Sequence, residues 1–392
     1  MKVVYLSNSI GKKSNGGSSL SGLRFLELLE SKFGQVTLVT DEWRSPPSST
    51  AQRTVELAAV DLVRHGWSFR QIVKLFIFTF VNLARKKTID INADNQDVLL
   101  VVNSFTTLVG KVNIKTTGTI TRVCVVRGDT TSFIYQSWGG PTTDPLEVPK
   151  RFLKIFDAII YVSKTICNNW INCGVDNMHW YLPNSIDEAE VSRVKTSSVT
   201  ETRLRLGMSS DKFHIVVVGS VQKRKGQDLF ATIADKLFAA IPKVEVHFVG
   251  VVSAAFGGEH IVDSLQRVGQ GCFIVHGHKD NVLEYVHAAD IVVSTSRSEA
   301  FPRTVAEYLA MGKPIISTRV AGADEMIIDK HNGFLIDIDD ADALFESIQE
   351  LISQPQTCKL FSNDAELTYE RLYSASRQEE RFIEIFNKIV RL

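Results

Sequence analysis

The sequence has few cysteines, and their spacing indicates neither disulfide pairs nor a shared zinc site. Its five cysteines form no Cys-x-x-Cys pair, and their number is odd. A disulfide scaffold, or a zinc site built on such pairs, is therefore not expected, and a reducing compartment suits the chain.

A surplus of one charge and a long hydrophobic run are also missing. Lys and Arg together number 44, and so do Asp and Glu. Nucleic-acid binders usually carry excess positive charge, so we expect no nucleic-acid partner. The most hydrophobic stretch, Leu75 to Ala84, is about half as long as a membrane span. The apolar start, Met1 to Leu6, is too short for a signal peptide. We expect a soluble, cytoplasmic protein.

The length and composition indicate large packed cores. The chain has 392 residues, of which 44% are hydrophobic and 22% are charged. This composition excludes a mostly disordered protein, and the length predicts two or three domains.

Short apolar runs alternate with helical patterns along the whole chain. Most runs are continuous Val, Ile and Leu, which is typical of strands buried on both faces. Helices are expected between them, for example at 19–31, 227–241 and 303–312. Such β-α repeats predict an α/β fold with parallel sheets. The expected strands are 2–7, 36–40, 97–102, 121–126, 157–162, 214–219, 244–250, 272–276, 290–294, 314–318 and a short one at 334–336.

A polar stretch from Asp187 to Asp211 divides the chain. We interpret it as a linker with one short helix near 202–206, between a domain at 1–186 and a second at 187–376. The amphipathic segment 377–392 is expected to form a helix that crosses back to the first domain. Two facing α/β domains create a cleft at the carboxyl ends of their strands, where ligands bind.

The run from Ser296 to Ile316 is the most informative motif of the second domain. It is expected to form a strand end, a loop, a helix beginning near Pro302, a turn and a strand. The first N–H groups of that helix can hold an anion. The candidate donor-binding residues here are Glu299, Phe301, Arg303, Thr304 and Glu307.

A second motif is the basic loop that follows strand 214–219. Gly219 and Ser220 lead into Lys223, Arg224 and Lys225. These cations can neutralise a diphosphate as it leaves. The loop is not a dinucleotide fingerprint, because Gly-x-Gly-x-x-Gly is absent from it.

Together these motifs resemble those of the GT-B retaining glycosyltransferases, in particular glycosyltransferase family 4. Glu299 and Glu307 match the family's E-x7-E motif. Lys225 matches the lysine of its G-R-x4-K-G loop, although Ser220 replaces the arginine. Pro183-Asn184-Ser185-Ile186-Asp187 resembles its P-N-G-[IV]-D hinge, with Ser185 in the place of glycine.

The resemblance implies a GT-B fold, in which two Rossmann-like domains face each other across a cleft. It implies retaining transfer from a nucleotide-diphosphate sugar to an acceptor hydroxyl, in polysaccharide or glycolipid biosynthesis. Glu299 would contact the donor sugar and Glu307 the ribose, while Lys225 and Arg224 stabilise the leaving diphosphate. The acceptor would be a carbohydrate or a lipid-linked sugar.

The first domain offers fewer candidates. Gly16 and Gly17 precede a helix, where the resembling family often contacts donor phosphate or acceptor, and Ser18 follows them. Arg127 stands where many members of that family place a histidine near the reacting carbon. It is a candidate for binding a charged acceptor or the phosphate, and Asp129 for orienting an acceptor hydroxyl.

The segment from Leu62 to Ile89 contains no acidic residue, and six basic residues lie between 64 and 87. One interpretation is an interfacial helix that contacts anionic lipid at the cytoplasmic membrane face. The other is a helix packed on the first sheet with a basic edge.

No metal or other cofactor is expected. Asp337-Ile338-Asp339 is a literal D-x-D, but its place before a helix at Ala341 predicts helix capping. Two other functions stay open: a nucleotide-sugar 2-epimerase of the same fold, and a non-catalytic partner subunit of a glycosyltransferase.

Overall fold

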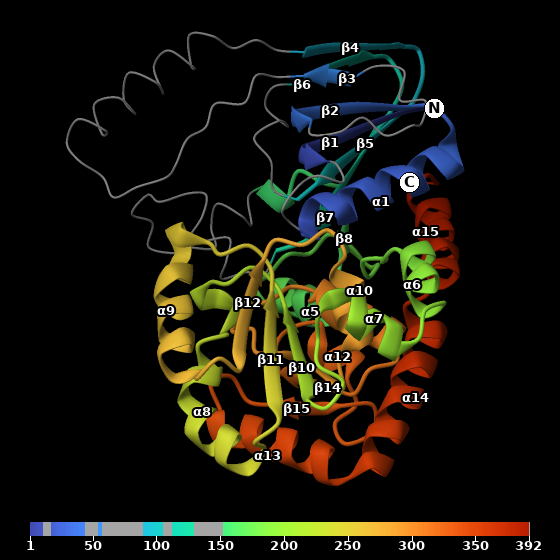
Figure 1. The fold of residues 1–392 in the computed structure, drawn as a ribbon. Helices are drawn as coiled ribbons and strands as arrows, with labels where there is room; N and C mark the ends of the chain where they lie inside the picture. The colour runs from blue at the N-terminus through green and yellow to red at the C-terminus, as the bar shows by residue number, and fades with distance from the viewer. Residues whose placement is uncertain (11–16, 44–53, 57–88, 105–111, 129–151, 392) are drawn as a thin grey trace, which may run out of the picture.

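The chain folds around two parallel β-sheets (Figure 1), which confirms the expected α/β class. The computed structural model describes residues 1–10, 17–43, 54–56, 89–104, 112–128 and 152–391. Every strand pairing between these residues is parallel. All eleven predicted strands are present, because continuous Val/Ile/Leu runs mark strands that are buried on both faces.

The first sheet has seven strands in the order β3-β2-β1-β5-β7-β8-β9. Its central strand β5 is buried at every residue. Helix α1 (Gly17–Phe33) follows β1 and packs on β1 and β2. The strands are β1 (Lys2–Ile10), β2 (Val36–Trp43), β3 (Thr54–Glu56), β5 (Val98–Asn103), β7 (Ile120–Val126), β8 (Ala158–Tyr161) and β9 (Met178–Tyr181).

The second sheet has six strands in the order β12-β11-β10-β13-β14-β15. The strands are β10 (Phe213–Val218), β11 (Val244–Val249), β12 (Phe273–Gly277), β13 (Ile291–Ser294), β14 (Ile315–Thr318) and β15 (Phe334–Ile336). The helices of this part are α8 (Leu229–Ala240), α9 (Gly258–Val268), α10 (Val282–Ala288), α11 (Arg303–Ala310), α12 (Ala323–Met326), α13 (Ala341–Ser353) and α14 (Pro355–Leu372).

Four of the strands in the described part of the chain were not predicted. β3 and β9 extend the two edges of the first sheet, and β4 (Ile89–Asp94) pairs with β6 (Val112–Thr116) in a small separate sheet. β4 reads Ile-Asp-Ile-Asn-Ala-Asp, so apolar and polar residues alternate along it. A search for continuous apolar runs misses such half-exposed strands.

The stretch 187–211 was predicted to contain one short helix near 202–206, and α7 (Val199–Leu206) lies there. A second helix, α6 (Glu188–Lys195), was not predicted. Asp187 caps α6 by accepting a hydrogen bond from the Glu190 N–H, and Ser198 and Glu201 form a capping box on α7. Both helices pack against α10, so the stretch belongs to a folded layer.

The last helix, α15 (Ala375–Ile389), leaves the second sheet and packs on α1 of the first (Figure 1). The ring of Phe386 lies 6.1 Å from that of Phe25 and 5.9 Å from that of Phe33. Lys32 Nζ donates a hydrogen bond to Asn387 Oδ1 at 2.6 Å. The C-terminal helix therefore completes a core that begins at the N-terminus.

Replacing Phe386 with alanine should destabilise the protein by about 3–5 kcal/mol, because a fully buried ring is lost and a cavity remains. Ile383→Ala is the matched control, since Ile383 lies on the same helix but is 40% exposed. Thermal unfolding measures both variants. Equal, small losses for both would mean that α15 does not contribute to this core.

Three predicted features lie outside the described residues: Gly16, Asp129 and the basic segment 64–87. Gly17 and Ser18 begin α1. Among the described helices, none combines the length and the apolar character that a membrane crossing requires.

Candidate functional site

The two motif loops of the second domain meet at the point where its strand order reverses. β10 lies between β11 and β13. From β10 the chain adds β11 and β12 on one side of the sheet, and then returns to add β13, β14 and β15 on the other side. Ligands bind at this switch point, outside the carboxyl ends of the strands. The basic loop follows β10, and the Glu299 loop follows β13.

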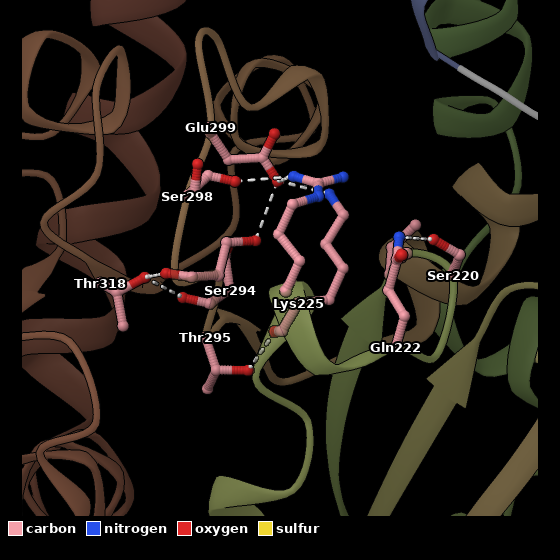
Figure 2. A network of polar contacts seen from close by, with 12 residues as sticks. Ser220, Gln222, Lys225, Ser294, Thr295, Ser298, Glu299 and Thr318 are labelled. Atoms are coloured by element: carbon pink, nitrogen blue, oxygen red, sulfur yellow. Dashed lines mark hydrogen bonds and ion pairs between the residues drawn. The ribbon is translucent and has the colours of Figure 1, made fainter. Parts of the chain in front are cut away.

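The basic loop turns tightly against the end of β13. Residues Lys223–Lys225 form a single 3-10 turn that ends at Gly226, with a φ of +67°. A Cβ on Gly226 would lie 2.0 Å from the Thr295 carbonyl oxygen, so only glycine fits there. Thr295 Oγ1 donates a hydrogen bond to the Lys225 carbonyl at 3.0 Å (Figure 2). This close approach fixes where the Lys225 side chain begins.

Glu299 contacts two of the three cations of that loop, and Figure 2 shows its contact with Lys225. Its Oε1 accepts hydrogen bonds from Lys225 Nζ at 2.6 Å and Ser296 Oγ at 3.0 Å, and lies 3.0 Å from Arg224 Nη1. Arg224 Nη1 also donates to the Ser298 carbonyl at 2.6 Å. Glu299 is only 11% exposed and Lys225 only 16%, so the pair is shielded from water.

The local field keeps Glu299 ionised. Burial on its own would raise the pKa of Glu299, but the positive charges of Lys225 and Arg224 and the hydrogen bonds outweigh it. The pKa of Glu299 is therefore below its ordinary value. The cluster consists of two cations sharing one carboxylate, and it carries one net positive charge.

The lowered pKa makes the contribution of Glu299 to stability depend on pH. That contribution is present above the unfolded-state pKa of about 4.3 and is lost as the pH falls through the lower folded-state pKa. Glu299→Gln should therefore unfold at a temperature several degrees below wild type at pH 7. The difference should shrink as the pH falls below about 4. A difference that stays constant from neutral to acid pH would contradict the assignment.

Helix α11 begins beside this cluster with no side-chain cap. Its N-cap residue is Pro302, which has no side-chain oxygen to accept from the first N–H groups. Arg303 Nε donates to Glu307 Oε1 at 3.0 Å one turn further on. Arg303 Nη1 is buried and has no hydrogen-bond partner among the described residues. The start of α11 therefore offers unpaired donors to an anion.

The other donor-site candidates are placed less directly. Ser220 Oγ accepts from Gln222 Nε2 at 2.7 Å within the basic loop. The Phe301 side chain is buried, and its ring lies 6.2 Å from that of Tyr373. Thr304 lies in the first turn of α11 and is half-buried.

The predicted capping role of Asp337 and Asp339 was wrong. Asp340 caps α13 by accepting from the Ala343 N–H at 2.9 Å. Asp339 instead accepts from Arg297 Nε at 2.7 Å, and Arg297 also binds Asp228 through both carboxylate oxygens. An N-cap side chain accepts from the N–H group two or three residues later, and Asp340 stands three residues before Ala343.

Arg127 lies at the carboxyl edge of the first sheet. Its Nε donates to Asn103 Oδ1 at 2.6 Å, at the end of β5, and its Nη1 donates to Asn184 Oδ1 in the hinge motif. Burial lowers the pKa of Arg127 from its ordinary value, and the charge of Arg303 acts in the same direction. Two side-chain amide oxygens therefore hold the Arg127 guanidinium at this edge.

The sequence pointed to Arg127 but not to Asn103, which holds it. Asn103 Nδ2 also donates to Ser7 Oγ on β1 at 3.0 Å, so one amide links three neighbouring strands. A polar residue directly after a buried strand is a signal that could have identified it.

Comparisons with known proteins match part of the chain to a described family. Residues 198–368 match the family described as Glycosyl transferases group 1. The D-inositol 3-phosphate glycosyltransferase of Arthrobacter sp. (strain FB24) is 28% identical over 161 residues, which are 40% of this chain and 38% of that protein. Alignments with curated relatives span roughly half of their length.

Solved structures resemble nearly the whole chain. Sucrose-phosphate synthase from Thermosynechococcus elongatus superposes with a TM-score of 0.73 at 17% identity, covering 99% of both chains. Anabaena HepE in complex with UDP-glucose gives 0.69 at 16% identity, covering 99% of this chain and 100% of HepE. These matches confirm the expected GT-B fold, and the family match supports the prediction of a transferase.

Proposed function

We propose that this chain, whose residues 198–368 match the Glycosyl transferases group 1 family, is a retaining glycosyltransferase that uses a nucleotide-diphosphate sugar. One observation carries the proposal. Lys225 and Glu299, from the loops after adjacent strands, meet at 2.6 Å beside a helix start that no side chain caps.

The cations of this cluster suit a leaving diphosphate. When the bond from the anomeric carbon to the diphosphate oxygen breaks, its electron pair stays on that oxygen. Lys225, Arg224 and the first N–H groups of α11 would stabilise the new charge. Glu299 already holds Lys225 and Arg224 at this place, and the diphosphate competes with that carboxylate for them.

Glu299 is proposed to bind hydroxyls of the donor sugar. Three donors hold its Oε1, and its ionised carboxylate can accept further hydrogen bonds from a sugar. Glu307, oriented by Arg303, is proposed to accept from the ribose hydroxyls. Arg127 would meet the acceptor or the phosphate from the first-domain side of the cleft.

A front-face reaction fits these roles. The acceptor oxygen attacks the anomeric carbon on the side that the diphosphate leaves, and the acceptor proton passes to a diphosphate oxygen. Glu299 is committed to Lys225 and Arg224, which makes it a poor covalent nucleophile. The two-carboxylate scheme of retaining hydrolases is therefore not proposed.

Transfer is proposed to need no metal at the diphosphate, because Lys225, Arg224 and the α11 N-terminus supply positive charge there. We further propose a cytoplasmic protein that acts on a carbohydrate or lipid-linked acceptor, in polysaccharide or glycolipid biosynthesis. The basic sequence of segment 64–87 supports the proposal that the protein contacts anionic membrane lipid.

A thermal-shift screen with nucleoside diphosphates tests donor binding, because a ligand that binds only the folded state raises the unfolding temperature. UDP is the first nucleoside diphosphate to test, because HepE was crystallised with UDP-glucose. Nucleoside diphosphate release from matching sugar donors, with and without EDTA, then tests transfer. Binding without release would indicate a non-catalytic subunit, and an epimerised nucleotide sugar would indicate a 2-epimerase.

A further inference from the structure

Three histidines and a glutamate gather inside the second sheet, away from the proposed donor site. His214 is on β10, Glu245 and His247 are on β11, and His276 is on β12. These strands are neighbours (Figure 1), and Glu245 lies directly opposite His214 in the parallel register. Since side chains alternate along a strand, Glu245 and His247 point to the same face. His214 and His247 are almost fully buried.

Three ligand atoms of this cluster form a nearly regular triangle. His214 Nδ1 and His247 Nε2 are 3.0 Å apart. Glu245 Oε2 lies 3.5 Å from His214 Nδ1 and 3.6 Å from His247 Nε2. A tetrahedral zinc ion with bonds of about 2.0–2.1 Å places its ligand atoms about 3.3 Å apart. The triangle therefore needs shifts of only a few tenths of an ångström to hold such an ion.

The hydrogen bonds around the triangle favour a metal-binding tautomer. His214 Nε2 lies 2.6 Å from the Ser209 carbonyl oxygen, which can only accept, so His214 carries its proton on Nε2. Its Nδ1 lone pair then faces His247 and Glu245. A histidine ligand typically donates its other N–H to a backbone carbonyl in this way.

His247 can present its own lone pair after a change of tautomer. Its Nδ1 lies 3.0 Å from His276 Nε2, so a proton on His247 Nδ1 has an acceptor there. Both ligating rings can thus direct a lone pair toward the same point.

We propose that His214, His247 and Glu245 bind one Zn²⁺ ion. Two imidazoles and one carboxylate are a known zinc ligand set, with the fourth position left to water. The ion would tie β10 to β11. His214 is the second residue of β10, five residues before Gly219, roughly 16 Å from the donor loop along the strand. The site is therefore separate from the proposed transfer.

Lys212 competes with the ion for the carboxylate. Its Nζ donates to Glu245 Oε1 at 2.7 Å, and both side chains reach the surface, at 37% and 12% exposure. This edge is the entry path for the ion. Lys212→Met should therefore raise zinc affinity several-fold by removing a positive charge next to the site.

Zinc titration of the metal-stripped full chain, against a chromophoric chelator, tests the proposal. We expect one Zn²⁺ per chain, a higher unfolding temperature with zinc, and the visible spectrum of tetrahedral Co²⁺ when cobalt replaces it. His247→Gln should weaken binding by about 100-fold or more, because one of three protein ligands is lost. His331→Gln is the control, since His331 is exposed and distant in sequence from the cluster.

A second variant keeps the test decisive if His247→Gln misfolds. Glu245→Gln preserves shape and a hydrogen-bond acceptor at the surface edge, and it should also weaken zinc binding. Folding of both variants is checked by circular dichroism without metal. Zinc binding that survives Glu245→Gln, or fewer than one ion per two wild-type chains, would overturn the proposal.

Discussion

Replacing Lys225 with alanine is expected to lower turnover by about 100-fold or more, and also to lower stability, because the shielded Glu299 carboxylate loses its closest cation. Lys225 is the cation closest to Glu299, and its side chain is only 16% exposed. A preorganised donor aimed at developing charge in such a shielded site contributes about 100- to 1,000-fold to the rate. Release of nucleoside diphosphate from the preferred sugar donor measures the effect.

Lys223→Ala is the matched control. Lys223 belongs to the same short turn and carries the same charge, but its side chain is exposed. An exposed cation is largely screened by water and salt, so its loss should change turnover by less than about threefold. Equal losses for the two variants would mean that the loop acts only through its total charge.

Glu299→Gln is expected to separate binding from transfer. In wild type, a diphosphate must compete with Glu299 for Lys225 and Arg224. Removing the carboxylate charge leaves two uncompensated cations, so nucleoside diphosphate should bind more tightly. Turnover should nevertheless fall by about 100-fold, because the variant no longer offers an anionic acceptor to the sugar hydroxyls.

Calorimetric titration with the nucleoside diphosphate and a rate measurement are needed on the same Glu299→Gln preparation. Weaker binding together with lower turnover would mean that Glu299 positions Lys225 and Arg224 for the diphosphate rather than binding the sugar. Unchanged turnover would remove Glu299 from the site altogether. Glu346→Gln, a change of the same kind on α13, should leave both quantities at wild-type values.

The buried strands of the fold could be predicted from the sequence, whereas the half-exposed ones could not. Val98–Asn103 is buried at every position, and burial on both faces selects an unbroken apolar run. Ile89–Asp94 is exposed on alternate residues, so its apolar residues are too sparse to form such a run. The helix at 188–195 was missed because its surface is polar, although Asp187 is a recognisable cap. The helix at 199–206 was predicted only over its last turn, near 202–206.

The candidate site was predictable where a motif spans few residues. Lys225, Glu299 and Glu307 each lie in a short loop-to-helix segment whose spacing fixes their place. The Asn103 and Asn184 contacts to Arg127 join residues far apart in the chain, so local patterns can mark each residue but not their pairing. The Lys225–Glu299 ion pair likewise depends on strand order, because β10 and β13 become neighbours only in the folded sheet.

Calorimetric titration of the purified chain with nucleoside diphosphates tests most directly whether the Lys225–Glu299 cluster is a donor site. Wild type and Lys223→Ala should bind one nucleoside diphosphate per chain with similar affinity. Lys225→Ala should bind it at least about 10-fold more weakly, because a shielded, charge-assisted hydrogen bond is worth about 1.5–3 kcal/mol. Equal affinity in all three proteins, or no binding of any nucleoside diphosphate to wild type, would contradict the proposed function.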